Sequence, residues 1–243
     1  MLKNIQIISG GKQTPSNSAD TYQCLNGGGG STSEIRAAGI SAAAGTIRNF
    51  KVKVSAAPGA EGSGKQWDIT IYKNGIPTAL TVTIFETATS ATYSGELIVA
   101  QGDYLSVKID PTNSPTSPFL LTWNTEYISE DNETLLMSNS WSSGTGNLFI
   151  SVFGNMTNSV NEFYTELLIP CAGTIKNLFV NASAAPGTGK YATFTVRKNQ
   201  SNQTVIVTLS GAQTNGNDVD HSFVVSPVFW ILIVSPAATT KEW

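Results

Sequence analysis

The chain has 243 residues, enough for two ordinary domains that each bury a core. Apolar residues make up 40% of it and charged residues 13%, about half the usual charged share of a soluble domain. A net charge of −3 without a basic run argues against nucleic acid or a membrane surface as a partner. The strongly apolar run from Phe223 to Val234 is interrupted by Pro227 and is too short to span a membrane, so we expect core or interface there.

The first twenty residues begin Met-Leu-Lys-Asn-Ile-Gln-Ile-Ile and lack the long apolar stretch and cleavage site of a signal peptide. We interpret residues 1–20 as an N-terminal arm. Ile5 and Ile7 are its candidate contacts with a partner.

Residues 21–129 are predicted to form a jelly-roll β-sandwich. Period-two segments rich in Val, Ile, Thr and aromatic residues alternate with Gly, Pro and Asn turns, and no segment shows a helical period. Asn74-Gly75 is typical of a tight hairpin turn. Eight strands are predicted, as in a two-sheet jelly roll: Thr21–Leu25, Ser33–Ile40, Thr46–Val54, Gln66–Tyr72, Leu80–Phe85, Ser94–Val99, Tyr104–Ile109 and Leu120–Tyr127.

The sequence then repeats itself. Ala44 to Gly59 returns with most positions identical as Ala172 to Gly187, and Lys65 to Pro111 aligns without a gap to Lys190 to Pro236. Self-similarity over about a hundred residues indicates two related domains rather than a solenoid. The fold class is therefore predicted as all-β, with two tandem jelly-roll domains that arose by internal duplication.

The polar residues 130–146, rich in Ser, Asn and Gly, are predicted as a linker. The second domain is assigned to residues 147–243. It stops before an equivalent of Leu120–Tyr127, so we expect it to lack its last strand and to have an open edge. A partner or the segment Asn4–Ile8 could supply that strand; an incomplete C-terminus is the alternative explanation.

One strand of the second repeat differs in its apolar pattern. The ungapped alignment places Trp230 at the inward position of Leu105, which leaves Phe229, Ile231 and Ile233 facing outward. A strand that is apolar on both faces is normally buried on both sides, and an exposed apolar patch marks an interface. We predict that these three side chains contact another subunit or the other domain. The alternative is a strand covered by its own loops.

The turns of the second repeat are expected to differ as well, because Asn199-Gln200 replaces Asn74-Gly75. The single histidine, His221, aligns with Glu96 and is expected to be a surface or turn residue; a metal site on a three-fold axis is the alternative.

No residue pattern predicts catalysis, a cofactor or a metal. The carboxylates are scattered, and a lone Asp218-x-Asp220 is weak support for calcium. Cys24 and Cys171 are expected to be free thiols. Trp67 and Trp123 lie in predicted strands, where core packing is the default, whereas Trp141 is the plausible exposed aromatic.

The motif Ala-Gly-Thr-Ile-(Arg/Lys)-Asn, followed by Ser-Ala-Ala-Pro-Gly and Lys-Asn, occurs in both repeats. It resembles a family of jelly-roll modules found in tailed-bacteriophage virion proteins and in C1q/TNF-like surface proteins of bacteria. The resemblance implies a compact, often trimeric, virion or extracellular module and no catalytic residue.

We therefore expect a non-enzymatic structural protein located in a virion: a phage capsid decoration, cement or head-fibre protein. Its expected partners are the major capsid protein or other virion proteins, bound as a homotrimer. A tail or baseplate protein, or a receptor-binding module that recognises a host glycan through its loops, is the alternative. A bacterial surface protein and an enzyme are further alternatives.

Overall fold

The computed structural model describes residues 4–27, 30–131, 133–136, 148–151, 159, 161–227, 229–235 and 239–240. Strands account for 61% of the chain and helices for 3%, which confirms the predicted all-β class. The chain divides into two compact units, Met1–Leu135 and Leu136–Trp243. The division falls inside the predicted linker, residues 130–146.

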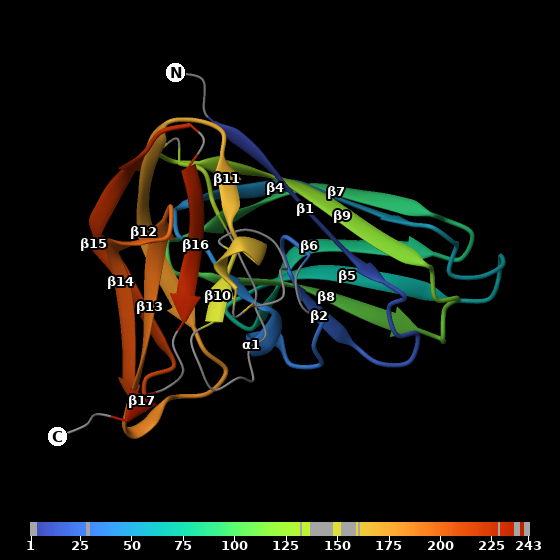
Figure 1. Cartoon of the computed structure of the whole chain (residues 1–243). Coiled ribbons are helices and arrows are strands. Elements are labelled where there is room, and N and C mark those ends of the chain that lie inside the picture. Colours follow the sequence, from blue (N-terminus) through green and yellow to red (C-terminus); the bar gives the residue numbers. More distant parts are fainter. Residues whose placement is uncertain are drawn as a thin grey trace. The chain divides into compact units, whose positions relative to one another are not determined.

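Unit 1 is a two-layered β-sandwich. One sheet has the strand order β1-β9-β4-β7 and the other β2-β8-β5-β6, with β3 beside β8; Figure 1 shows the first sheet above the second. Without the short β3, the remaining eight strands form two facing antiparallel four-stranded sheets, which is the arrangement of a jelly roll. The strands are β1 (Ile5–Gln13), β2 (Thr21–Cys24), β3 (Gly39–Ile40), β4 (Gly45–Val54), β5 (Gln66–Lys73), β6 (Ile76–Phe85), β7 (Ser90–Val99), β8 (Tyr104–Thr112) and β9 (Leu120–Ser129).

The segment interpreted as an N-terminal arm contains the first strand of this jelly roll. β1 pairs with β9 along its whole length, from Ile5 opposite Ile128 to Gln13 opposite Leu120. It forms an edge of the first sheet. Residues 5–13 are therefore part of unit 1 rather than a separate arm.

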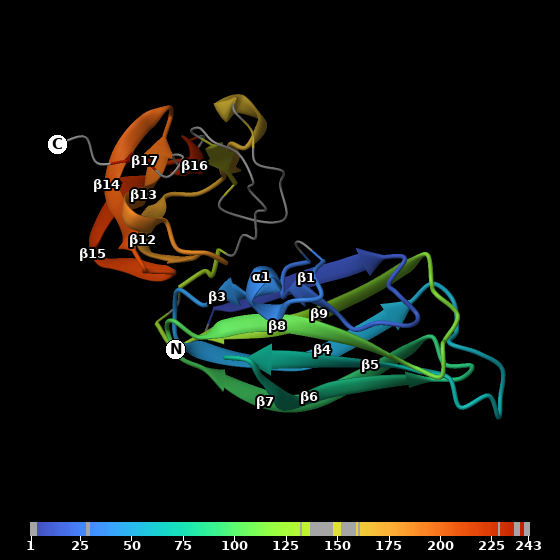
Figure 2. The ribbon, with the colours of Figure 1, turned by 90° about the horizontal axis from the view of Figure 1, so that it is seen from below.

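The strand predicted over Ser33–Ile40 is wrong. Its first half is the short helix α1 (Glu34–Ala37), and β3 has two residues. Glu, Ile, Arg and Ala in succession include strong helix formers, and four residues are too few to show a helical period. The helix lies against β2 and β8 (Figure 2) and buries Ala37 there.

The core of unit 1 lies between the two sheets. Its largest fully buried side chains include Trp67, Trp123, Tyr127 and Phe50, which confirms the two predicted core tryptophans. Trp123 Nε1 donates to the carbonyl of Leu25 at 2.7 Å. The hydroxyl of Tyr127 lies 3.1 Å from the carbonyls of Ala43 and Ala44, to which it can donate, whereas the buried Nε1 of Trp67 has no hydrogen-bond partner among the described residues.

Unit 2 contains a larger sheet and a smaller one. The larger has the order β10-β16-β13-β14, with β11 on β16 and β17 on β13, and the smaller pairs β12 with β15. The elements are β10 (Leu148–Ile150), the 3₁₀ turn η1 (Glu162–Tyr164), β11 (Leu167–Ile169), β12 (Gly173–Asn181), β13 (Gly187–Lys198), β14 (Ser201–Gly211), β15 (Asn215–Val225), β16 (Phe229–Ser235) and β17 (Thr239–Thr240).

The two units use the same pairing scheme. β12 pairs with β15 as β4 pairs with β7, and β13 pairs with β14 and β16 as β5 pairs with β6 and β8. The repeated motif places an Asn at the same β-bulge, Asn49 in β4 and Asn177 in β12, with φ of 55° and 61°. Asn adopts this left-handed conformation more readily than most residues, which explains why both copies of the motif carry it.

The expectation that the hairpin turns differ is wrong for Asn199-Gln200. Both residues have positive φ, 48° and 65°, as do Asn74 and Gly75 with 54° and 79°. Two central residues with positive φ define a type I′ turn. Arg197 holds the turn without its glycine, because its guanidinium donates to the carbonyl of Gln200.

Candidate interaction site

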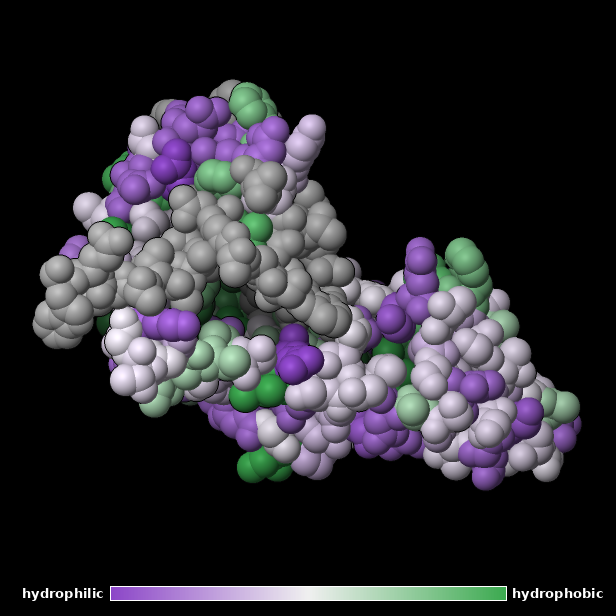
Figure 3. Space-filling view, turned by 60° about the horizontal axis from the view of Figure 1, so that its bottom comes forward, coloured by the Kyte–Doolittle hydropathy of each residue, from purple (hydrophilic) through white to green (hydrophobic). Residues whose placement is uncertain are grey.

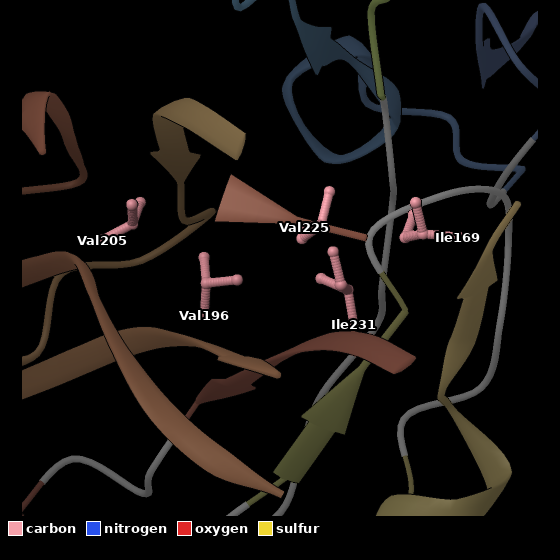
Figure 4. Packing of buried hydrophobic residues seen from close by; sticks show 5 residues of the cluster. All are labelled: Ile169, Val196, Val205, Val225 and Ile231. Carbon is pink, nitrogen blue, oxygen red and sulfur yellow. The ribbon is translucent and has the colours of Figure 1, made fainter. Parts of the chain in front are cut away.

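β16 carries Phe229, Ile231 and Ile233, which were predicted to face outward as an interface, and it packs into the core of unit 2. Ile231 is fully buried, and Ile233 packs against the same cluster while remaining partly exposed. The side chain of Phe229 lies outside the part of the chain that the structure describes. The outward assignment is therefore wrong for the two isoleucines. Figure 4 shows the buried cluster, which consists of Ile169, Val196, Val205, Val225 and Ile231.

One extra residue in β15 explains the error. At the bulge opposite β12, β15 has three residues, Val219, Asp220 and His221, where β7 has two opposite β4. From this bulge on, the equivalence of the units is displaced by one residue, and pairing with β13 puts Ile231 in the place of Leu105. A displacement of one residue moves every side chain to the opposite face of the sheet. The ungapped alignment missed this insertion.

Asp218 holds the longer bulge. Its carboxylate is buried and accepts hydrogen bonds from the backbone N–H of His221 at 3.1 Å and of Ile206 in β14 at 2.8 Å. His221 Nδ1 lies 3.0 Å from the same carboxylate. Burial raises the pKa of Asp218, but the donors from Ile206 and His221 outweigh this effect and hold the pKa below its ordinary value. His221 is exposed, and Ser222, not His221, takes the place of Glu96.

β1 presents the two candidate contacts near the N-terminus. Ile5 and Ile7 are 51% and 60% exposed, whereas Ile8 is buried. The side-chain amide of Gln6 exchanges two hydrogen bonds of 2.8 Å with the backbone of Leu135, which fixes the end of unit 1 beside this strand. The outer face of β1 keeps its exposed isoleucines, and a contact there with a partner stays a prediction.

Unit 2 has an open position beside β12. In unit 1, β4 lies between β7 and β9, whereas among the described strands β12 pairs with β15 alone. Ile47 and Phe50 of β4 are fully buried, but their counterparts Ile175 and Leu178 are partly exposed. We call this position, on the side of β12 opposite β15, the β12 edge.

Two equivalent glycines show the space at the β12 edge. A Cβ atom at Gly45 would lie 2.6 Å from the carbonyl oxygen of Ile128 and 2.7 Å from the ring of Tyr127, both in β9. A Cβ atom at Gly173 would meet no atom within 4 Å among the residues described. The place that β9 fills in unit 1 is thus empty in the described part of unit 2.

An ion pair joins β4 and β9 in unit 1, and its basic residue has an equivalent at the β12 edge. Arg48 Nε lies 2.9 Å from Glu126 Oε2, and the hydrogen bond from Arg48 lowers the pKa of Glu126. Lys176 takes the place of Arg48 in β12. The open edge of the second domain, expected because an equivalent of Leu120–Tyr127 is missing, stays a prediction; among the described strands, β12 lacks the neighbour that β4 has in β9. Arg48 and Lys176, the basic residues at one position of the repeated motif, were the sequence feature that could have pointed to this side of the strand.

Within the described ranges, no group of three or more His, Cys, Asp or Glu side chains is placed to hold a metal ion. Cys24 and Cys171 are both free thiols; Cys24 is buried, and burial raises its pKa to about 11, whereas Cys171 is exposed. Trp141 lies outside the described residues. No helix in the described part of the chain is long and apolar enough to cross a membrane.

The visible surface is mixed in character. Figure 3 shows one face, on which apolar residues occur singly or in small groups among polar ones. Comparison with known proteins adds no assignment: no family model matches the sequence, and no curated protein is similar to it.

Proposed function

We propose that the chain is a non-enzymatic structural protein of a virion, a capsid decoration, cement or head-fibre protein that binds the assembled shell. The observation that carries the proposal is the contrast between the two units. Unit 1 has all eight jelly-roll strands, whereas unit 2 presents the open β12 edge in its described part. An open edge with apolar residues behind it is unfavourable in water and favours pairing with another chain. In an assembled particle, a neighbouring subunit could pair with this edge and cover the apolar residues behind it.

The sequence supports the same proposal. The repeated motif resembles jelly-roll modules of phage virions, and a surface with few charges suits dense packing. A protein that binds only the assembled shell stabilises it by mass action. We assign the shell contact to unit 2 and expect a homotrimer, which would multiply weak contacts through avidity.

Cryo-electron microscopy of the native particle tests this function. Density at every local three-fold or hexamer centre of an icosahedral shell is the expected result, with three copies at each site. A few copies at a tail tip would replace the capsid assignment with a tail or baseplate role. A particle that does not contain the chain would refute the virion role.

Recognition of a host glycan is the second candidate. It is favoured by Phe163 and Tyr164, which lie next to each other on η1 and are both 70% exposed. Exposed aromatic faces are suited to stacking on apolar faces of sugars. Glycan-array binding that is lost in the double variant Phe163→Ala, Tyr164→Ala would support it, and an array without signal would exclude it.

A further inference from the structure

We infer that Asn74 is a site of spontaneous deamidation, restrained by Asp103, and that its conversion unlocks two neighbouring turns of unit 1. Asn74 lies in the turn between β5 and β6, and Asp103 lies in the turn between β7 and β8. The inference goes beyond the proposed function and does not rest on it.

The reaction uses groups of the chain and water alone. The backbone nitrogen of Gly75 loses its proton to solvent and attacks the side-chain carbonyl carbon of Asn74, so that a five-membered imide ring forms. The bond from this carbon to Nδ2 breaks, and the nitrogen takes up a proton and leaves as ammonia. One water molecule then opens the ring, at the side-chain carbonyl to give aspartate or at the main-chain carbonyl to give isoaspartate.

The position of Asn74 and Gly75 suits this attack. Both are exposed central residues of the β5–β6 turn, with φ of 54° and 79°. Glycine has no side chain to hinder the approach to its nitrogen. The hydrogen bond that closes such a turn uses the N–H of the next residue, Ile76. The turn bond therefore does not occupy the attacking nitrogen of Gly75.

Two other asparagines in the sequence precede a glycine, and both are less suited. Gly27, which follows Asn26, donates its N–H to the carbonyl of Cys24 at 2.8 Å. Asn215 and Gly216 lie within β15 and are paired with β12. Local opening is easier at an exposed turn than in a paired strand, so we expect Asn74 to react first.

Three hydrogen bonds hold Asn74 in the closed turn. Its N–H donates to the carbonyl of Tyr104 at 2.9 Å, and its Oδ1 accepts from the N–H of Tyr104 at 2.8 Å. Its Nδ2 donates to Asp103 Oδ1 at 2.6 Å. Ring closure needs Cβ of Asn74 and the nitrogen of Gly75 on the same side of the Cα–C bond, whereas the left-handed conformation puts them on nearly opposite sides. The turn must therefore open before the attack, and the three bonds oppose its opening.

The product faces a carboxylate that is itself held in place. The N–H of Ala100 donates to Asp103 Oδ2 at 2.8 Å, and Lys73 Nζ lies 3.7 Å from the same oxygen. After deamidation, a negatively charged oxygen replaces the donor Nδ2 opposite Asp103 Oδ1. Two carboxylates that share one site repel each other, so the two turns separate at this point.

Peptide mapping of the full chain by mass spectrometry, after incubation in mildly alkaline buffer, tests the site. We expect aspartate and isoaspartate at position 74 before positions 26 and 215. Asp103→Ala should speed the conversion about tenfold, because the turn opens more often. Asp68→Ala is the matched control: its carboxylate accepts hydrogen bonds from Gln66 and Thr83, away from the turn, and its loss should leave the rate within about twofold. An Asn74 that stays intact, or equal rates in the two variants, would overturn the inference.

Exchanging the two side chains tests the unlocking. Asn74→Asp reproduces the aspartate product and should speed hydrogen exchange at the N–H groups of Ala100 and Tyr104 about tenfold, without a change in the middle of β5. Adding Asp103→Asn returns an amide donor opposite the carboxylate and should restore slow exchange. Fast exchange in both variants, or slow exchange in Asn74→Asp alone, would contradict the unlocking. Neither experiment needs a particle, so its failure leaves the virion role standing, and a particle without the chain leaves the deamidation result standing.

Discussion

Replacing Ile231 by Ala should destabilise unit 2 substantially, because its side chain is fully buried in the core cluster. The substitution removes three carbons, worth about 2.4 kcal/mol at about 0.8 kcal/mol for each buried methylene. The remaining cavity adds to this loss, but Ile233 and Leu178 pack against the cluster while partly exposed and can move inward. We therefore expect a loss of about 3 kcal/mol, in the lower half of the range for Ile→Ala in cores.

Hydrogen exchange across a urea series is the suitable assay, because a chain with two units does not unfold in one two-state transition. The amides of Val196 and Val205 report on unit 2, and those of β5 in unit 1 serve as an internal reference. Val224→Ala, at a site 68% exposed, should cost less than about 0.5 kcal/mol. Equal losses for Ile231→Ala and Val224→Ala would refute the core assignment and restore β16 as an outer interface.

Three further predictions concern other parts of the chain. Gly45→Ala should destabilise unit 1 by about 1–3 kcal/mol, because the added Cβ would collide with β9. Gly173→Ala should destabilise unit 2 by less than about 0.5 kcal/mol in the same exchange assay. Similar losses for the two variants would show that the β12 edge is filled. The pKa of Asp218 is lowered in the folded state, so its carboxylate stabilises unit 2 above the unfolded value of about 3.9. That contribution is lost as the pH falls through the folded pKa, and Asp218→Asn should flatten the stability profile below about pH 4. Native labelling with a thiol reagent should modify Cys171 and spare Cys24, with both reacting in denaturant; rapid labelling of Cys24 in the native chain would contradict its burial.

Much of unit 1 could be predicted because its signals are local. Period-two apolar patterns and tight turns identified the strands of the central sandwich, and the core positions of Trp67 and Trp123 followed from the alternation. β1 was missed as a strand because Ser9, Gly10 and Gly11 interrupt its apolar pattern. Tertiary packing requires glycine at position 10, because a Cβ atom there would lie 2.7 Å from the ring of Trp123.

The face of β16 could not be read from the alignment. The extra residue in the β15 bulge lies between Asp218 and Ser222, where the two repeats share no identical residue to anchor a gap. The bulge depends on the Asp218 carboxylate, which accepts hydrogen bonds from the backbone N–H groups of Ile206 in β14 and His221 in β15, and such contacts leave no periodic pattern in the sequence. Side-chain alternation gives the two faces of a strand, but which face is buried depends on register.

The pairing of β1 with β9 constrains how unit 1 forms during synthesis. Ile5 and Ile128 are neighbours in the sheet but lie near opposite ends of unit 1 in sequence. At roughly 5–20 residues per second, β9 leaves the ribosome roughly 6–25 seconds after β1. Throughout that interval β1 has no strand to pair with, because β9 is its only neighbour among the described strands of the sheet. β4 lacks the same neighbour, since β9 lies between β1 and β4 in the finished sheet. The first sheet therefore closes late, and a nascent chain of unit 1 depends on protection of these strands until its last segment emerges.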